Sequence, residues 1–446
     1  MDERADIVIC GAGITGIATA HALSTHHGRN GILMLDPLPP LSLTSAASGE
    51  NYRNWWPQAR LAEFAARSID LVELLAGPKC ENFRIARRGY AYVTRSKNVD
   101  GVINHLYETY GNIGAGDIRV HEKGSAPPDA RDGADVLVHR DAIEARYPHL
   151  SGDIGSVILV RRAGEFDTQQ LGLHMLKEAK ERGVRLMRAE LRCVAANRDG
   201  FRLEAETPEG MLTIETGTFI NAAGPFAKNI ASMLDVDLPL DCIYQQKIAF
   251  EDHLGVVPRD APFTIDQDAG LLDWPDDARA LLAEDPGTAW LTQVQPGGVH
   301  MRPESGENSR WIKLGWATND MPEEPVRERS GNDHFPEIVM RGAARMAPGL
   351  TAYCEALPRA LTHYGGYYTR TAENWPLIGP MGPDRAFMVA GLSGYGTMMA
   401  CAAGELCAAW VTGAELPDYA RDFSLLRYQD VSLMQAFERA YDDGEL

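Results

Sequence analysis

The sequence of 446 residues is acidic, with 43 Lys and Arg against 62 Asp and Glu and a formal net charge of −19. This charge argues against nucleic acid or an anionic membrane surface as a partner. The length suffices for two or three domains with sizeable cores. No apolar stretch reaches the roughly 18 to 20 residues that a membrane-spanning helix needs. The N-terminus lacks a basic leader segment and the seven cysteines form no Cys-x-x-Cys pair, so we expect a cytoplasmic protein with reduced thiols and no metal site.

The first 36 residues carry a dinucleotide-binding pattern. A β-branched strand (6–10) runs into Gly-x-Gly-x-x-Gly, which opens a helix to about Ser24, and a second apolar strand (32–35) ends in an acid. The glycines permit a tight turn, close approach to a pyrophosphate and close packing of helix on strand, while the helix N-terminus offers free N–H groups. The residues that we expect to contact the cofactor here are Gly11, Gly13, Ile14, Thr15, Gly16 and Asp36. The pattern alone leaves FAD and NAD open.

The chain next leaves the sheet and returns to it. Pro37–Pro40 and a Ser/Thr/Ala-rich loop (41–49) precede an aromatic segment, and apolar residues at helical spacing predict a helix from Leu61 to about Leu75. A strand over 88–93 follows, and residues 96–140 are polar and expected to be peripheral. Thr168 is a predicted N-cap of a helix to about Arg182. Further strands are predicted at 184–188, 193–196, 201–206, 212–215 and 218–221.

The remaining sequence contains a strand-rich region and then a second glycine-rich strand–loop–helix element. Residues 240–320 contain predicted strands separated by Asp/Pro-rich loops, which is typical of an antiparallel sheet. Near the C-terminus, a short buried strand (387–390) leads into three glycines within 391–396 and then a helix from Thr397 to about Val411. This second glycine-rich strand–loop–helix element favours close approach of backbone to a ligand over a plain helix start.

Four segments, in order along most of the chain, together resemble the FAD-dependent oxidoreductases of the D-amino-acid oxidase superfamily, on the branch of sarcosine and glycine oxidases. They are the N-terminal fingerprint, Asn-Ala-Ala-Gly-Pro at 221–225, the segment 368–380, and Gly-Leu-Ser-Gly-Tyr-Gly at 391–396. The resemblance implies FAD as the cofactor, with its ring held by the C-terminal loop and helix. It also implies hydride removal from a C–H beside an amine, or less often a hydroxyl, onto flavin N5.

With this resemblance, the fold class is expected to be α/β (α+β). A discontinuous Rossmann-type FAD-binding domain would comprise residues 1–85, 150–238 and 355–446. A second, mainly antiparallel β-sheet domain for the substrate would comprise 86–149 and 239–354. The family cysteine that binds flavin covalently falls at Gly366, so non-covalent FAD is expected. Further residues implied as cofactor contacts are Ser48, Arg53, Leu191, Ala223, Gly224, Gly366, Gly394, Tyr395, Gly396, Thr397 and Met398.

Four residues are implied as catalytic or substrate-binding. Lys313 lies in a segment similar to the family strand whose lysine activates oxygen near N5, although a surface lysine on an edge strand is the alternative. His300 and Arg302 lie on the strand whose counterpart contacts substrate, and Arg53 resembles an arginine near the flavin face. Either arginine can hold a carboxylate bidentately.

The chain also departs from the family pattern. Ala317 and Met398 stand where sarcosine oxidases have a substrate histidine and a carboxylate-binding lysine, so substrate handling must differ. Four aromatic residues are candidates for a cavity wall that suits a larger amine, with core packing as the alternative. They are Trp55, Trp56, Trp316 and Tyr368.

The sequence therefore predicts an FAD-dependent oxidase that acts on the C–N bond of an amino acid or N-alkyl amino acid, with oxygen as acceptor, giving an imine and hydrogen peroxide. One alternative is an FAD dehydrogenase of an amine or 2-hydroxy acid that passes electrons to a quinone or carrier protein. Another is a flavoprotein assembly subunit that has lost catalysis, because the carboxylate lysine and the histidine are missing.

Overall fold

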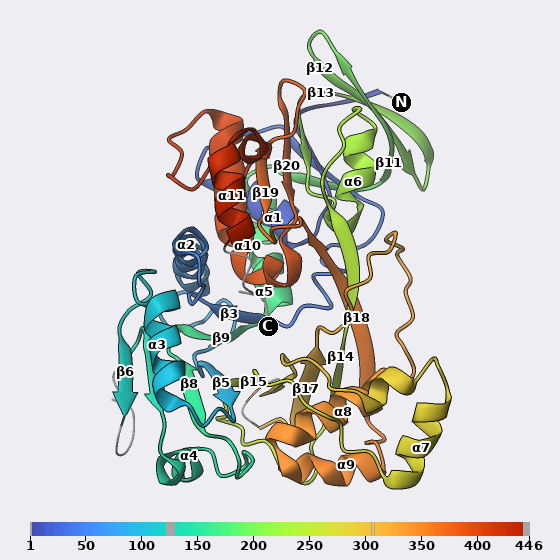
Figure 1. Ribbon diagram of the computed structural model, residues 1–446. Helices are drawn as coiled ribbons and strands as arrows, with labels where there is room; N and C mark the ends of the chain where they lie inside the picture. The colour runs from blue at the N-terminus through green and yellow to red at the C-terminus, as the bar shows by residue number, and fades with distance from the viewer. Residues whose placement is uncertain (1, 122–129, 305, 307, 440–446) are drawn as a thin grey trace.

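The computed structural model describes residues 2–121, 130–304, 306 and 308–439. Two large sheets organise this part of the chain. An eight-stranded sheet lies in the upper half of Figure 1 and a nine-stranded sheet in the lower half, with the long strands β14 and β18 running lengthwise beside each other. This arrangement confirms the predicted α/β fold class.

The eight-stranded sheet contains the N-terminal fingerprint. Its strand order is β10-β2-β1-β13-β12-β11, with β20 on β13 and β19 on β20. Strands β1, β2, β10, β13 and β20 are parallel, so their carboxyl ends meet at one edge, where open α/β sheets bind ligands. The bounds are β1 Asp2–Cys10, β2 Ile32–Asp36, β10 Arg185–Arg188, β11 Glu190–Asn197, β12 Gly200–Thr207, β13 Gly210–Asn221, β19 Leu377–Pro380 and β20 Ala386–Ala390.

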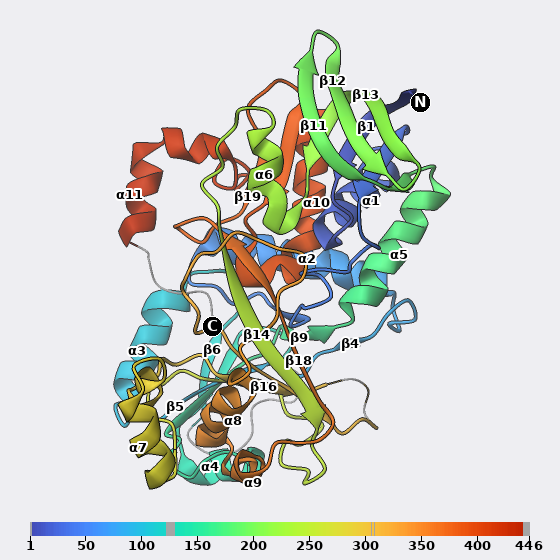
Figure 2. The same cartoon turned by 90° about the vertical axis from the view of Figure 1, so that its right-hand side faces the viewer.

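Helices cover the face of this sheet toward which Ile7 and Ile9 point. Together with these two side chains they form one buried apolar core, while Val8 on the opposite face belongs to a second core. Helix α1 packs between α5 and α10 (Figure 2). The bounds of the helices on this face are α1 Ile14–Thr25, α2 Ala59–Ala76, α5 Thr168–Glu181, α10 Gly396–Thr412 and α11 Val431–Arg439. Helix α6 Ala227–Ser232 packs in the second core, on the face of Val8. The N-cap of α5 is Asp167, one residue before the predicted Thr168, and its side chain accepts from the Gln170 N–H at 2.8 Å.

The nine-stranded sheet has the order β18-β14-β17-β16-β15-β5-β8-β7-β6 and is mainly antiparallel, with parallel pairs at β15–β5 and β6–β7. Its strands are β5 Tyr90–Thr94, β6 Ile118–His121, β7 Ala134–Leu137, β8 Ser156–Val160, β14 Asp241–Glu251, β15 Phe263–Asp266, β16 His300–Pro303, β17 Trp311–Trp316 and β18 Leu361–Arg370. Associated helices are α3 Val99–Tyr110, α4 Arg140–Arg146, α7 Asp276–Glu284, α8 Phe335–Met346 and α9 Thr351–Glu355.

A third, small sheet joins β3 Asn51–Arg53, β9 Ala163–Phe166 and β4 Ile85–Ala86. Short 3-10 turns are η1 Gly224–Phe226, η2 Ala289–Thr292, η3 Pro348–Leu350, η4 Ser393–Tyr395 and η5 Leu425–Gln429.

Two strands lie in the other sheet from the one implied by the predicted domain boundaries. β8 and β18 fall within ranges predicted for the FAD-binding domain, yet both hydrogen-bond into the nine-stranded sheet. β18 pairs with β14 from Asp241–Arg370 to Phe250–Leu361, and this long ladder outweighs its closeness in sequence to β19. Residues 96–140, predicted as peripheral, contribute β6 and β7 to the same sheet.

None of the helices in the described residues has both the length and the apolar character needed to cross a membrane.

Gly404 determines how closely α1 and α10 approach each other. A Cβ added there would lie 2.4 Å from the carbonyl carbon of Ala18. Gly404→Ala should therefore push the helices apart at a cost of roughly 1–3 kcal/mol, against a helix-propensity gain of about 1 kcal/mol. We expect a lower Tm in thermal unfolding. Gly217→Ala, whose Cβ would meet its nearest atom, Asp6 O, at 3.5 Å, is the control; a Gly404→Ala variant as stable as this control contradicts the packing argument.

Candidate active site

A cavity of about 380 Å³ opens at the carboxyl edge of the parallel strands. It begins at the ends of β1 and β2, passes along the loop 37–49 and the turn after β13, and reaches the start of α10. Both glycine-rich segments found in the sequence therefore face one cavity. We call it the cofactor cavity.

The fingerprint glycines have different tasks in the structure. Gly11 has a φ of +112° and its hypothetical Cβ would lie 2.2 Å from Ala222 O, so only glycine fits. Gly16 packs its Cα against Gly11 O, which a Cβ would approach to 2.1 Å, and it does not line the cavity. Gly13 does line it, next to the N-terminus of α1. The Ile14 N–H there donates to Ser45 Oγ at 3.0 Å.

Asp36 closes the same end of the cofactor cavity. One carboxylate oxygen accepts from the Ala12 N–H at 2.7 Å and the other from the Leu38 N–H at 2.9 Å. Burial raises the pKa of this carboxyl, although the backbone donors oppose the shift. Each oxygen keeps a lone pair, so the carboxylate can also accept hydrogen bonds from ribose hydroxyls.

The other end of the cofactor cavity is built by the start of α10. The turn η4 leads into the helix, and Thr397 in its first turn shares a hydrogen bond of 2.7 Å between hydroxyls with Ser48. Tyr395 donates from its hydroxyl to Asn374 O at 2.5 Å. These bonds fix the helix N-terminus, whose free N–H groups and positive dipole end can stabilise negative charge on a ligand.

Most residues predicted to contact the cofactor line this cavity. Those that do are Gly11, Gly13, Ile14, Thr15, Asp36, Ser48, Leu191, Ala223, Gly224, Gly366, Gly394, Gly396 and Thr397. Gly16 acts in packing instead. Arg53, Tyr395 and Met398 lie beyond the cofactor cavity and line a second one.

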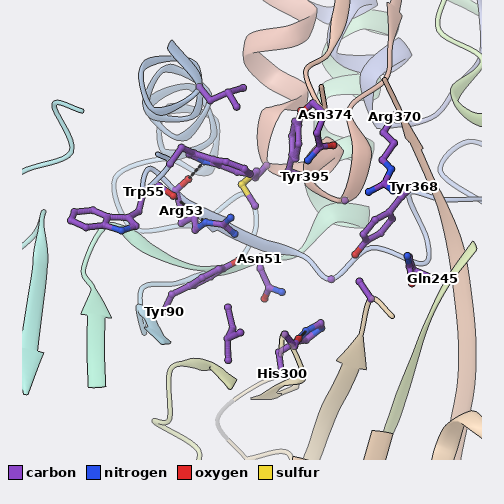
Figure 3. A pocket seen from close by; sticks show the side chains of 18 of the residues that line it. Asn51, Arg53, Trp55, Tyr90, Gln245, His300, Tyr368, Arg370, Asn374 and Tyr395 are labelled. Carbon is purple, nitrogen blue, oxygen red and sulfur yellow. Dashed lines mark hydrogen bonds between the residues drawn. The ribbon is translucent and has the colours of Figure 1, made fainter. Parts of the chain in front are cut away.

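The second cavity has a volume of about 700 Å³ and lies between the two large sheets. In Figure 3, Arg53, Trp55 and Tyr90 lie on one side, with Tyr368 and Arg370 across from them. Its aromatic lining is extensive: Trp55, Trp56, Tyr90, Tyr92, Tyr110, Tyr368, Trp375 and Tyr395. Trp316, predicted as part of this wall, instead packs in the core of the nine-stranded sheet and donates to Gly297 O at 3.1 Å.

The two cavities meet at a set of residues that line both. We call this set the shared wall, and it consists of Ser48, Gly49, Lys247, Tyr368, Gly394 and Thr397. A flat cofactor ring at this wall would be open on one side to a molecule in the second cavity. Substrate chemistry therefore belongs at the shared wall, and the second cavity is the candidate substrate cavity.

Arg53 lies in the substrate cavity, as predicted, but is held by its neighbours. It is only 4% exposed, its Nε donates to Trp55 O at 3.1 Å, and its guanidinium stacks 4.2 Å from the Trp56 ring centroid. Tyr90 covers it at 5.5 Å. Arg53 therefore places a fixed positive charge among aromatic rings.

Arg302 and Lys313 do not line either cavity. They form a buried charge cluster with Glu50 and Glu304: Arg302 lies 3.3 Å from the Glu50 carboxylate and 2.9 Å from that of Glu304, and Lys313 lies 3.7 Å and 2.9 Å from the same two. Arg302 also donates to Gly49 O at 2.9 Å and Lys313 to Ser48 O at 3.4 Å. Both cations therefore hold the loop 48–50 from behind.

His300 lines the substrate cavity as a neutral group. Its Nδ1 lies 3.0 Å from Gly298 O, and because a carbonyl only accepts, Nδ1 carries the proton and Nε2 is left as an acceptor. Burial, with the cations Lys247 and Arg302 nearby, lowers the pKa of His300 to about 3. The imidazole thus stays uncharged at neutral pH.

Lys247 on β14 is a residue that the sequence patterns did not single out. It is 6% exposed and is the charged residue of the shared wall. Its signal in the sequence was a lysine in the interior of a predicted strand, with no motif around it. Only the pairing of β14 with β17 and β18 shows which cavity it faces.

The residues of the cofactor cavity fit FAD. A helix N-terminus with Gly13 suits a pyrophosphate, Asp36 suits a ribose, and a second helix N-terminus with Gly394, Gly396 and Thr397 suits the electron-rich side of a flavin ring. NAD binding would need only the first of these elements. The hydrogen-bond donors of the cofactor cavity therefore agree with FAD, the cofactor that the family resemblance implies.

Comparison with known proteins gives the family. A family model described as FAD dependent oxidoreductase matches residues 6–410. The chain belongs to this family, and it is an FAD-dependent oxidoreductase; the predicted resemblance is confirmed. Human mitochondrial dimethylglycine dehydrogenase is 24% identical over 259 residues, which cover 57% of this chain and 27% of the relative. The chain therefore matches only about a quarter of that protein's length.

Solved structures share the fold over nearly the whole chain. L-proline dehydrogenase from P. horikoshii has a TM-score of 0.72 at 18% identity and covers 96% of this chain and 99% of its own. Glycine oxidase from Geobacillus kaustophilus has a TM-score of 0.71 at 16% identity, covering 95% and 98%. Iminodiacetate oxidase from Chelativorans sp. BNC1 has a TM-score of 0.69 at 17% identity, covering 94% and 98%. At these identities the likeness establishes the architecture.

Gly13 and Gly16 should respond differently to substitution. A Cβ at Gly13 would meet only Ser45 Oγ, at 3.3 Å, so Gly13→Val should fold but fill the phosphate end of the cofactor cavity. We expect FAD affinity to fall by more than about tenfold, with little change in the Tm of the apoprotein. Titration of apoprotein with FAD measures this.

Gly16→Ala is the matched comparison, because its Cβ would clash with Gly11 O. Here the Tm of the apoprotein itself should fall. If Gly13→Val binds FAD as tightly as wild type, the phosphates do not lie at this helix N-terminus.

Proposed function

We propose that the protein oxidises the C–N bond of an amino acid or N-alkyl amino acid, with oxygen as the acceptor. Bound FAD would supply the oxidant, taking a hydride at N5 from the C–H beside the amine and returning the electrons to oxygen as hydrogen peroxide while the substrate leaves as an imine. The observation that carries the proposal is the shared wall, where the cofactor cavity opens into a cavity with an extensive aromatic lining and buried cations. The names of the glycine and iminodiacetate oxidases and of L-proline dehydrogenase support an amino acid as substrate class.

The residues of the substrate cavity suit this reaction. Aromatic rings can pack against a substrate side chain, and a buried cation in the cavity wall favours a carboxylate. His300, neutral and with Nε2 free to accept, can take a hydrogen bond from the substrate amine. Oxidation beside nitrogen requires the amine lone pair, and a neutral acceptor does not stabilise the protonated amine as a carboxylate would.

Non-covalent attachment of FAD is part of the proposal. Gly366 lines the cofactor cavity at the position of the family cysteine and offers no sulfur. Cys10 also lines the cavity, but it lies at the end of β1 near Asp36, and burial raises the pKa of its thiol to about 12. Its unreactive, protonated state argues against a covalent link there.

The acceptor distinguishes our proposal from its main alternative, a dehydrogenase of an amine or 2-hydroxy acid. We expect amino acids or N-methyl amino acids to bleach the flavin absorbance under anaerobic conditions, and air then to re-oxidise the protein faster than it re-oxidises free flavin. Stopped-flow absorbance measures both steps. Re-oxidation no faster than free flavin favours the dehydrogenase, whereas bleaching by 2-hydroxy acids alone excludes the amine reaction. No bleaching by any of these compounds leaves the non-catalytic assembly subunit.

Lys313 was predicted to activate oxygen, and its contacts favour a different task. Replacing it by Met removes one of the two cations that contact Glu50 and Glu304 in the buried charge cluster. Breaking a buried pair costs roughly 3–5 kcal/mol. We therefore expect Lys313→Met to lower the Tm and weaken FAD binding, with re-oxidation and substrate reduction of the loaded fraction changed about equally. Selective slowing of re-oxidation in a variant of wild-type stability would restore the direct role in oxygen activation.

A further inference from the structure

The side chain of Lys247 occupies a special position in the shared wall. Cross-strand pairing sets it in one row with Gly315 on β17 and Tyr364 on β18, and His300 on β16 follows in the same row beyond Gly315. Paired residues of a sheet point to the same face, so this face looks toward the two cavities. On the opposite side, a Cβ on Gly49 would lie 3.8 Å from Lys247 Cε. Lys247 therefore lies between the sheet and the loop that carries Gly49.

The charge of Lys247 has no counter-ion in the part of the chain that the structure describes: no carboxylate there lies within ion-pair distance of its ammonium. The ammonium lies 5.6 Å from the centroid of the Tyr368 ring. Lys313, which is equally buried, has two carboxylates. Burial, and then the cations Lys313 and Arg302, lower the pKa of Lys247 to about 8. A buried cation without a partner is costly, and a bound anion would offset that cost.

The other positive groups near the shared wall are engaged. Arg302 and Lys313 are neutralised in the buried charge cluster, and Arg53 is bonded to Trp55 O and stacked between rings. Arg370, which also lines the substrate cavity, likewise has an interaction partner within the protein. Met398, at the place where relatives would supply a lysine, lines the substrate cavity without charge. Lys247 thus lines both the substrate cavity and the cofactor cavity, and its ammonium has no carboxylate partner among the described residues.

We propose that Lys247 binds the carboxylate of the amino acid substrate and so determines which C–H faces the cofactor cavity. This inference rests on the proposed function, and it names the residue that would restrict the substrates to amino acids. An ammonium on β14 holds the carboxylate at the sheet side of the shared wall. The substrate side chain then extends toward Trp55, Tyr90 and the other rings across the cavity (Figure 3).

The first test measures binding without turnover. A carboxylic acid that lacks an amine, used as probe, is titrated calorimetrically into FAD-loaded wild type, Lys247→Met and Lys228→Met, the last changing an exposed lysine on α6. We expect Lys247→Met alone to weaken binding by about 10- to 100-fold, the usual loss for a hydrogen bond to a charged group. Its Tm should equal or exceed that of wild type, because an unpaired buried charge has been removed. Unchanged probe affinity overturns the proposal.

The second test pairs each amino acid with its decarboxylated amine. For the amino acid, Lys247→Met should lower kcat/KM by a similar 10- to 100-fold factor, while for the amine it should change kcat/KM little, because no carboxylate is present to lose its partner. Equal losses for both substrates overturn the proposal. So does selective slowing of re-oxidation, which would assign the charge to oxygen instead. If Lys247→Met weakens probe binding but no amino acid reduces wild type, the carboxylate site stands and the proposed function fails.

The third test uses pH and the conservative variant Lys247→Arg. A lysine binds an anion only while protonated, so wild-type probe affinity should fall as pH rises through about 8, whereas arginine keeps its charge and its affinity. Of its neighbours, His300 has its pKa lowered to about 3, and burial raises that of Tyr364. A pH profile unchanged in Lys247→Arg contradicts the assignment. The groups that face Lys247 from packed elements are His300, Arg302, Lys313, Tyr364 and Tyr368.

Discussion

The buried charge cluster of Glu50, Arg302, Lys313 and Glu304 is the constraint on which the site depends. It joins β16 and β17 of the nine-stranded sheet to the loop 48–50, and through the Ser48–Thr397 hydrogen bond to α10. Glu50 itself has a φ of +62°, a conformation that an L residue rarely adopts and that these contacts hold in place. Because loop 48–50 contributes Ser48 and Gly49 to the shared wall, the cluster sets where the two cavities meet.

The cofactor cavity brings together helix ends from distant parts of the chain. α1 and α10 are separated by most of the sequence, yet they pack through Gly404 and present their N-termini to one cofactor cavity. A cofactor with a phosphate group at one end and an electron-rich ring at the other matches two positive helix ends in one cavity. Gly404 therefore helps to position the two helices relative to each other, although it does not line the cofactor cavity itself.

Local signals in the sequence predicted the cofactor site well and the charges poorly. The strands and glycines around residues 6–36 and 387–397 specify their own geometry, so nearly all the predicted contacts there line the cavity. Lys313 and Arg302 looked like free cations in the sequence because Glu50 lies far away along the chain and no motif marks Glu304 as the partner of both. Lys247 had no motif, and the pairing of β18 with β14 was not predicted, because strand pairing over long separations leaves no local pattern.

The position of positive charge decides how a substrate can enter such a site. A cation at the start of α10 would hold a carboxylate beside the helix, but Met398 there is apolar and lies among aromatic residues. With Lys247 on β14 as the carboxylate ligand, the head of the substrate lies against the sheet and the helix side is left for an apolar group. The aromatic lining can then contact a bulky substituent on the amino acid, a group that the small N-methyl glycine lacks.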